Sequence, residues 1–180
     1  MKCRIGEGEL ALWQGDITSL SVDAIVTAAN AGLRGGGGVD GAVHRAAGPR
    51  LLEACREIGG CPTGDAVVTP AFDLASKGVR HVVHAVGPRW SGGQRGEDDL
   101  LRSVYRRSLE LADEAACRSI ALPSISTGVY GFPVERAAPL GLAVVREFLE
   151  RPPRHIERVV FALFDHATFE RFRASLREIC

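Results

Sequence analysis

The stretch "VDAIVTAANAGLRGGGGVDGAVHRAAG" (residues 22–48) decides the predicted fold. Residues 22–29 are mostly apolar and rich in β-branched side chains, which is typical of a buried strand. Residues 39–48 place apolar residues at helical spacing, and Gly48-Pro49 ends that helix. Four consecutive glycines, Gly35–Gly38, stand between the two elements. Glycine is costly to order, so either this loop is loose or a ligand needs bare backbone there.

The rest of the chain repeats this alternation of strand and helix. We predict further strands at 9–14, 65–71, 80–86, 119–125 and 156–164, and further helices at 49–60, 97–117, 133–150 and 167–179. The first two strands have no helix between them, which makes them candidates for an antiparallel pair. Pro139 predicts a kink or a late start in the helix at 133–150. The pattern indicates one α/β domain over residues 1–180, with a mixed, largely parallel central sheet.

Composition and charge narrow the classes of function. The chain is 46% hydrophobic and 24% charged, as in ordinary soluble proteins, and carries 22 basic and 22 acidic residues. This balance argues against a general nucleic-acid binder, which normally has a basic excess. A small anion remains a possible ligand, because backbone amides at a helix N-terminus hold phosphate without net charge. No apolar run suggests a signal peptide or a membrane span, so we expect a cytoplasmic monomer.

The cysteines and histidines give no pattern of a metal or redox site. The five cysteines are scattered and contain no C-x-x-C pair, so we predict neither a disulfide framework nor a zinc site. His81 and His84 are three apart on a predicted strand and should face opposite ways. His44 lies on the helix at 39–48. We therefore predict no metal and no cofactor.

Two loops stand where ligands bind in such sheets, beyond the carboxyl ends of strands: residues 28–39 and 124–132. In the first loop the glycines lead into a helix N-terminus, where free amides favour an anion. It matches neither the G-x-G-x-x-G nor the G-x-x-x-x-G-K-[ST] fingerprint, and taken alone a floppy turn is at least as plausible. The second loop, "PSISTGVYGFP" (123–133), also offers small residues and amides. Together the loops could clamp a diphosphate.

Three blocks of sequence carry a family resemblance. They are "GDITSLSVDAIVTAANAGLRGGGGVDGAVHRAAGP" (15–49), "HVVHAVGP" (81–88) and "PSISTGVYGFP" (123–133). In this order they resemble the signature of macrodomains, in particular the MacroD-type ADP-ribosyl hydrolases, and the similarity runs from about Glu9 to the end. It implies a three-layer α/β/α macrodomain whose ligand is ADP-ribose.

The resemblance also implies roles for individual residues. Asp16 would accept a hydrogen bond from the adenine amino group with Ile17 beside it, although Asp16 also suits a turn cap. Asn30 would hold the distal ribose, with a turn residue as the alternative. Phe164 would stack on adenine, and a plain core phenylalanine is nearly as plausible. The two phosphate loops would consist of Gly36, Gly37, Gly38 and Val39, and of Ser126, Thr127, Gly128, Val129 and Tyr130. Tyr130 would lie against the distal ribose, whereas Phe132 would support its loop.

Asp40 would carry the chemistry that the resemblance implies. The matching aspartate of MacroD-like hydrolases lies near the bond between the distal ribose and the modified side chain. The predicted activity is hydrolysis of an ester of ADP-ribose with Asp or Glu, or of O-acetyl-ADP-ribose. Asp40 would activate a water, a task that phosphate oxygens of the substrate can share. As a plain first-turn acid, Asp40 would only favour the helix dipole by about 0.3–1 kcal/mol.

Two alternatives and one departure stay open. The chain could be a reader that binds ADP-ribose without hydrolysing it, but a reader does not need a carboxylate at position 40. Nucleic acid is an unlikely partner, apart from ADP-ribosylated ends. Related sequences usually show Asn-Ala-Ala-Asn where this chain has "TAAN" (27–30), so Thr27 makes the positioning of Asn30 less secure.

Overall fold

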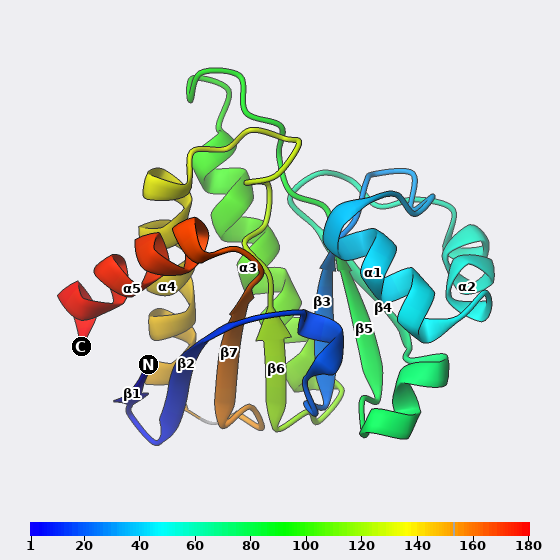
Figure 1. Ribbon diagram of the computed structural model, residues 1–180, viewed down its shortest axis with the longest axis horizontal. Coiled ribbons are helices and arrows are strands. Elements are labelled where there is room, and N and C mark those ends of the chain that lie inside the picture. The colour runs from blue at the N-terminus through cyan, green and yellow to red at the C-terminus, as the bar shows by residue number, and fades with distance from the viewer. Residues whose placement is uncertain (153) are drawn as a thin grey trace.

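The computed structural model describes residues 1–152 and 154–180, and a sheet of seven strands in the order β1-β2-β7-β6-β3-β5-β4 forms its centre (Figure 1). The strands are β1 (Lys2–Ile5), β2 (Gly8–Gln14), β3 (Ala24–Ala28), β4 (Ala66–Pro70), β5 (His81–Ala85), β6 (Ser119–Leu122) and β7 (Arg158–Leu163). β2, β7, β6, β3 and β5 run parallel to one another, and β1 and β4 close the two edges antiparallel. The predicted mixed, largely parallel sheet is confirmed.

Helices cover both faces of this sheet. The α-helices are α1 (Gly38–Ala47), α2 (Arg50–Ile58), α3 (Glu97–Glu114), α4 (Val134–Glu150) and α5 (His166–Ile179), and the short 3-10 helices are η1 (Ile17–Ser19) and η2 (Phe72–Lys77). α3, α4 and α5 share one apolar core with the sheet, whereas η1, α1 and η2 share another on the opposite face. The result is an α/β/α arrangement of three layers. None of the helices in the described ranges combines the length and the apolar character needed to cross a membrane.

The predicted antiparallel pairing of the first two strands is wrong. β2 pairs with β1, a strand that we did not predict, and with β7, whereas β3 lies between β6 and β5. The connection at 15–23 crosses one face of the sheet and buries Ile17 and Val22 against α1. Placing β3 in the centre covers both faces of its apolar run, whose residues Ala24, Ile25 and Val26 are fully buried.

Two local predictions also need correction. The link between β4 and β5, which the residue pattern predicts as a polar turn, contains the 3-10 helix η2. α4 starts at Val134, directly after Pro133, so Pro139 does not delay the helix. Pro139 is the sixth residue of α4 and removes one amide hydrogen bond of the helix, but it lies on the exposed surface, where water can solvate the carbonyl left without a donor.

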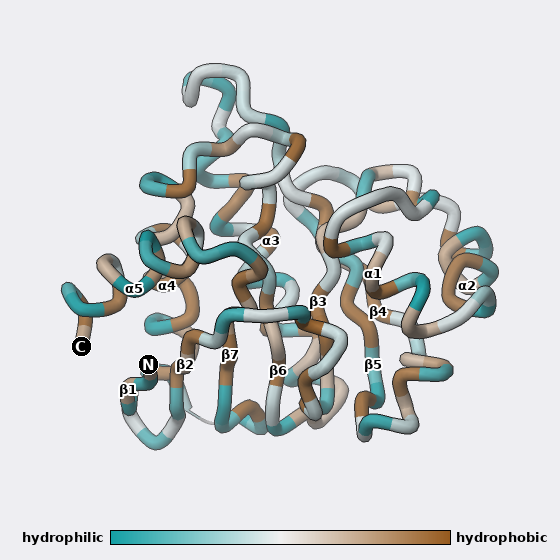
Figure 2. The backbone as a smooth tube through the Cα atoms, in the orientation of Figure 1, coloured by the Kyte–Doolittle hydropathy of each residue, from teal (hydrophilic) through white to brown (hydrophobic). Residues whose placement is uncertain are grey.

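The core positions the loops at the carboxyl edge of the sheet. Figure 2 shows hydrophobic residues concentrated along the central strands, whereas the loops above the strand ends are mostly pale or hydrophilic, with single hydrophobic positions. The buried hydroxyl of Tyr105 on α3 donates to Pro123 O at 3.0 Å and accepts from Ile125 N at 2.9 Å. This pair of bonds fixes the first residues of the second loop, because buried polar groups rarely stay unpaired.

A disulfide joins the two ends of the chain, contrary to our prediction that the cysteines form none. Cys3 on β1 and Cys180 after α5 are bonded, with their Cα atoms 6.1 Å apart. The chain ends lie side by side at one edge of the sheet (Figure 1). The two cysteines are 177 residues apart, so their spacing in the sequence gave no indication that they would pair. Cys55, Cys61 and Cys117 are free and buried.

Candidate ligand-binding and active site

The glycine loop and α1 present open backbone at the carboxyl end of β3. A Cβ built on Gly36, Gly37 or Gly38 would meet nothing within 4 Å. Gly37 caps α1 without a side-chain hydrogen bond, so the first-turn amides are free to meet a ligand. Gly35 and Gly38 have φ of 77° and 57°, which favour glycine. The loop therefore has the geometry of an anion cradle.

Gly41, which we did not single out, allows this loop to lie on α1. A Cβ at Gly41 would come within 2.6 Å of Gly36 O, a backbone atom that has little room to move. The amide of Gly41 donates to Gly37 O at 3.1 Å and closes the first turn of the helix. The glycine at the end of "GVDG" (38–41) is visible in the sequence, but only the fold shows that this position needs a residue without a side chain.

The second loop follows β6, the neighbour of β3, so both loops lie at the same edge of the sheet (Figure 1). Ser126 has a left-handed φ of 67°, and its buried Oγ has no hydrogen-bond partner within the described chain. A hydroxyl in this state is suited to a ligand oxygen. Thr127 Oγ1 is already engaged with Ser124, at 2.7 Å from its Oγ, whereas Val129 is fully exposed at the loop tip.

The segment after β5 holds the second loop in place. Phe132 is buried and packs on Trp90 with ring centroids 4.8 Å apart, which confirms its supporting role. Trp90 N donates to Tyr130 O at 2.8 Å, and the guanidinium of Arg89 lies over the Tyr130 ring, 4.8 Å from its centroid. Tyr130 is thus half-buried, with one face covered by a cation.

Glu97 anchors the same segment from the start of α3. Its carboxylate accepts the amides of Ser91 and Gly93 at 2.9 Å each and that of Arg95 at 2.6 Å. These backbone hydrogen bonds lower the pKa of Glu97 from its ordinary 4.5 to about 2. A buried carboxylate therefore stays ionised and orders residues 91–95.

Asp40 lies behind the glycine loop, in the first turn of α1, and only 5% of its surface is exposed. Its Oδ1 accepts a 2.9 Å hydrogen bond from Thr27 Oγ1 on β3 and lies 3.6 Å from His44 Nε2, one helical turn away. Burial raises the pKa of the carboxyl, and the contacts with Thr27 and His44 oppose that rise. His44, which we had noted only as a residue of this helix, therefore belongs to the site.

Asn30 shapes the glycine loop directly. Its Nδ2 donates to Gly35 O at 2.8 Å, and its Oδ1 accepts from Arg34 N at 3.0 Å. Each group keeps further capacity, because an amide nitrogen has two hydrogens and an amide oxygen two lone pairs. Thr27 does not contact Asn30 but Asp40, so the departure at position 27 bears on the carboxylate rather than on the asparagine.

A second end of the site forms where β2 and β7 finish side by side. Gly15 N donates to Leu163 O at 3.0 Å, which brings Asp16 and Phe164 to the same edge. Asp16 Oδ1 caps η1 through Thr18 N at 2.9 Å, so its capping role is confirmed, while Ile17 is buried beneath it. Phe164 is 75% exposed, which rules out the core alternative and leaves its ring free to stack on a base.

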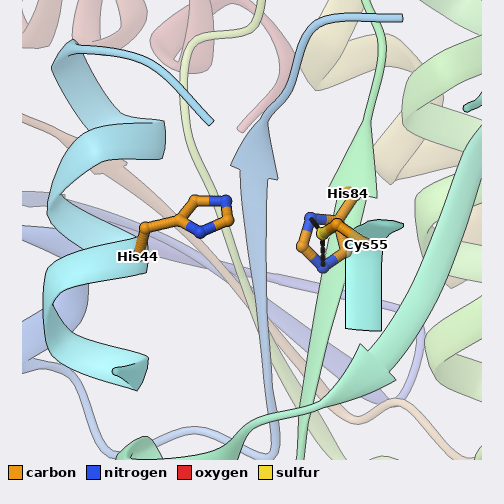
Figure 3. Close-up of side chains that lie close together, drawn as sticks. All are labelled: His44, Cys55 and His84. Carbon is orange, nitrogen blue, oxygen red and sulfur yellow. Dashed lines mark hydrogen bonds between the residues drawn. The ribbon is translucent and has the colours of Figure 1, made fainter. Parts of the chain in front are cut away.

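We did not predict the cluster that forms from His44 of α1, Cys55 of α2 and His84 of β5 (Figure 3). Their candidate ligand atoms lie within 4.8 Å of one another. Cys55 Sγ is 3.7 Å from Nδ1 and 3.9 Å from Nε2 of His84. Because the two distances are nearly equal, the sulfur does not lie along the in-plane lone pair of either nitrogen, which is the direction that binds a metal. Thr69 Oγ1 already engages His84 Nε2 at 3.0 Å.

Burial keeps the deeper part of this cluster uncharged. It lowers the pKa of His84 to about 4 and raises that of the Cys55 thiol to about 11. His84 is neutral, which is the form of imidazole that binds metals, but Cys55 stays a thiol at neutral pH, and a cysteine binds metal as the thiolate. The cluster is better described as packed, hydrogen-bonded support beneath Asp40 and His44.

A comparison with known families decides the identity of the fold. The family model Macro domain matches residues 26–141, which include both loops, Asn30 and Asp40. This chain belongs to the macro domain family. The predicted macrodomain fold is thereby confirmed.

Individual relatives agree with this assignment. A macro domain-containing protein of Chlorobaculum tepidum is 56% identical over 163 residues, covering 91% of this chain and 92% of that protein. A Salmonella newport protein named O-acetyl-ADP-ribose deacetylase is 53% identical over 163 residues, covering 88% of this macrodomain and 89% of the relative. A mutant of the Oceanobacillus iheyensis macrodomain with ADPR superposes with a TM-score of 0.93 at 38% identity, covering 99% and 97% of the two chains.

Proposed function

We propose that this macrodomain binds ADP-ribose and hydrolyses esters of its distal ribose, either with Asp or Glu side chains of proteins or with acetate in O-acetyl-ADP-ribose. The observation that carries the proposal is the buried Asp40 carboxylate, held by Thr27 and His44 directly behind the open glycine loop. A relative named O-acetyl-ADP-ribose deacetylase and a neighbour with ADPR support it.

The proposed binding of ADP-ribose follows from the order of residues along the carboxyl edge of the sheet. Adenine would stack on Phe164 with Asp16 nearby, and the diphosphate would meet the first-turn amides of α1 and the unpartnered Ser126 hydroxyl. The distal ribose would then lie between Asn30 and Tyr130. This order brings the ribose ester to Asp40, because Asp40 follows the glycine loop by one residue.

In the proposed hydrolysis, Asp40 acts as the base that accepts a proton from the attacking water. Asp40 accepts one proton from the water as the water oxygen bonds to the ester carbonyl carbon, and returns that proton to the ribose oxygen as the acyl C–O bond breaks. The products are a free carboxylic acid and ADP-ribose with its hydroxyl restored. A carboxylate with a raised pKa is the better base, and burial raises that of Asp40. Phosphate oxygens of the substrate can share this task.

A non-catalytic reader is the second candidate, because the loops would serve it equally well. The buried carboxylate argues for the enzyme, since burying a charge is costly and binding alone does not need one at this place. The two functions differ in turnover and not in affinity.

The decisive experiment compares wild type with Asp40→Asn, which keeps the shape of the side chain. ADP-ribose affinity is measured by calorimetry, and activity by release of label from a protein ADP-ribosylated on Glu and by hydrolysis of O-acetyl-ADP-ribose. We expect both proteins to bind and the variant to lose about 10²–10⁴-fold in turnover. Binding without turnover in wild type would identify a reader, and full activity of Asp40→Asn would remove Asp40 from the chemistry.

A further inference from the structure

Thr27 makes a contact that our sequence analysis did not assign to it. The residue is fully buried on β3, beside His84 of β5 in the sheet register, and its Oγ1 lies 2.9 Å from Asp40 Oδ1. An ionised carboxylate has no hydrogen to give, so the threonine hydroxyl is the donor. A buried hydrogen bond to a charged group is among the stronger ones that a side chain can make.

Both neighbours of Asp40 contact the same carboxylate oxygen. Thr27 Oγ1 and His44 Nε2 approach Oδ1, at 2.9 and 3.6 Å. Oδ2 has no partner within the described chain. Within residues 1–152 and 154–180, the fully buried polar side-chain atoms without a partner are Ser126 Oγ and Arg154 Nε. Oδ2 of Asp40 is not among them, so this oxygen is not fully buried. Oδ2 is therefore the oxygen of Asp40 that solvent or a substrate water can reach.

We propose that Thr27 is a positioning residue for the hydrolysis, because its hydroxyl holds Oδ1 and leaves Oδ2 directed to the reacting water. The inference rests on the proposed function and adds a specific contributor to it. The short, branched side chain has one stiff rotamer preference, so it fixes the carboxylate with little freedom of its own.

The charged and titratable groups around Asp40 define what its pH dependence can report. On its own helix it faces His44, and the elements packed against it bring Thr27 from β3, Cys55 from α2 and His84 from β5. Cys55 stays protonated up to a pKa of about 11, and His84 is neutral above a pKa of about 4. His44 is the remaining group, so a His44→Gln variant is titrated in parallel.

The test uses three variants of the intact protein. Thr27→Val keeps the branched shape and removes the hydroxyl, Thr27→Ser keeps the hydroxyl, and Thr27→Cys keeps a small side chain with a thiol, which is a weak donor. For each we measure kcat and KM for release of ADP-ribose from a Glu-modified protein, affinity for ADP-ribose, the pH profile of kcat, and the thermal midpoint.

We expect Thr27→Val to lower kcat by about 10- to 100-fold, the value of a hydrogen bond to a charged group, with KM and ADP-ribose affinity nearly unchanged. Because the Thr27 bond lowers the pKa of Asp40, its loss should move the acid limb of the profile to higher pH. Thr27→Ser should recover most of kcat. A merely structural role would change the thermal midpoint without moving the acid limb.

Two outcomes are kept apart. An active wild type with unchanged kcat and acid limb in Thr27→Val overturns this inference and leaves the proposed function intact. An inactive wild type overturns the proposed function. The contact is then decided by NMR titration of the Asp40 carboxyl carbon, where equal midpoints in wild type and Thr27→Val would exclude a role for the hydroxyl. If Thr27→Val does not fold, Thr27→Ser with wild-type kcat and Thr27→Cys with reduced kcat and a shifted limb support the inference, and equal profiles of all three overturn it.

Discussion

The Oγ of Ser126 lies directly against the α-carbon of Gly87, so a Cβ at position 87 would collide with that oxygen and come within 2.5 Å of Ile125 Cγ2. Gly87 follows β5, and Ser126 belongs to the loop after β6. The close approach of these two loops therefore depends on a missing side chain. The unpartnered Ser126 hydroxyl lies in this contact, at the sheet edge where the diphosphate is proposed to bind.

Gly87→Ala should displace the second loop. We expect a loss of about 1–3 kcal/mol in the free energy of unfolding, as for an overpacked core, together with weaker ADP-ribose binding. Chemical unfolding and calorimetry measure the two effects. Adding Ser126→Ala removes one of the two clashing groups and should restore part of the stability, whereas Gly128→Ala, with nothing within 4 Å of its Cβ, should be neutral for stability. Strictly additive losses in the double variant would contradict this packing.

Phe164→Ala should reduce ligand affinity without destabilising the fold. The ring is 75% exposed, so its removal opens no cavity. Base stacking is worth about 1–3 kcal/mol, which corresponds to a roughly 5- to 150-fold weaker Kd for ADP-ribose. The matched control is Phe161→Ala, which removes a fully buried ring 5.0 Å from that of Phe172 and should cost about 3–5 kcal/mol in stability. An unchanged Kd in Phe164→Ala would place adenine elsewhere.

Glu97→Gln should loosen residues 91–95 in a pH-dependent way. The pKa of Glu97 is about 2 in the folded protein against an ordinary 4.5, so the folded state binds its proton more weakly. The stabilisation by Glu97 is therefore complete above pH 4.5 and is lost as the pH falls towards 2. Melting temperatures of wild type and Glu97→Gln should differ by a constant amount above that window and converge below it. A constant difference down to pH 2 would show that the carboxylate is not the anchor.

Reduction of the Cys3–Cys180 disulfide should destabilise the protein and leave the site intact. The bond closes nearly the whole chain, and removing such a cross-link typically costs about 2–5 kcal/mol. Denaturant unfolding with and without dithiothreitol tests this, and Cys3→Ser should match reduced wild type and ignore the reductant. ADP-ribose affinity should not change, since the chain ends lie away from the loop edge (Figure 1). Equal stability of both redox forms would mean that the cross-link does not hold the ends.

Much of the candidate site could be predicted from the sequence, because many of its residues are close together along the chain. The glycine run, Asp40 and the α1 start are consecutive, and a strand, loop and helix in series place free amides at a sheet edge by backbone geometry alone. The resemblance of three blocks to macrodomains then named the family, which the family model confirms. The small residues of the second loop were likewise visible as a contiguous motif.

The tertiary structure decided what depends on contacts between distant segments. Strand order placed β3 between β6 and β5 rather than beside β2, since an apolar strand needs cover on both faces. Packing of α1 and α2 on the sheet brought His44, Cys55 and His84 together, and the crossing of β3 under α1 gave Asp40 its bond to Thr27. The disulfide and the Gly87–Ser126 contact belong to the same class. The sequence by itself determined the local turns and the residues that the site contains. Which side chains from distant segments become neighbours depends on how the helices and the sheet pack, and hydrophobic burial favours one such packing.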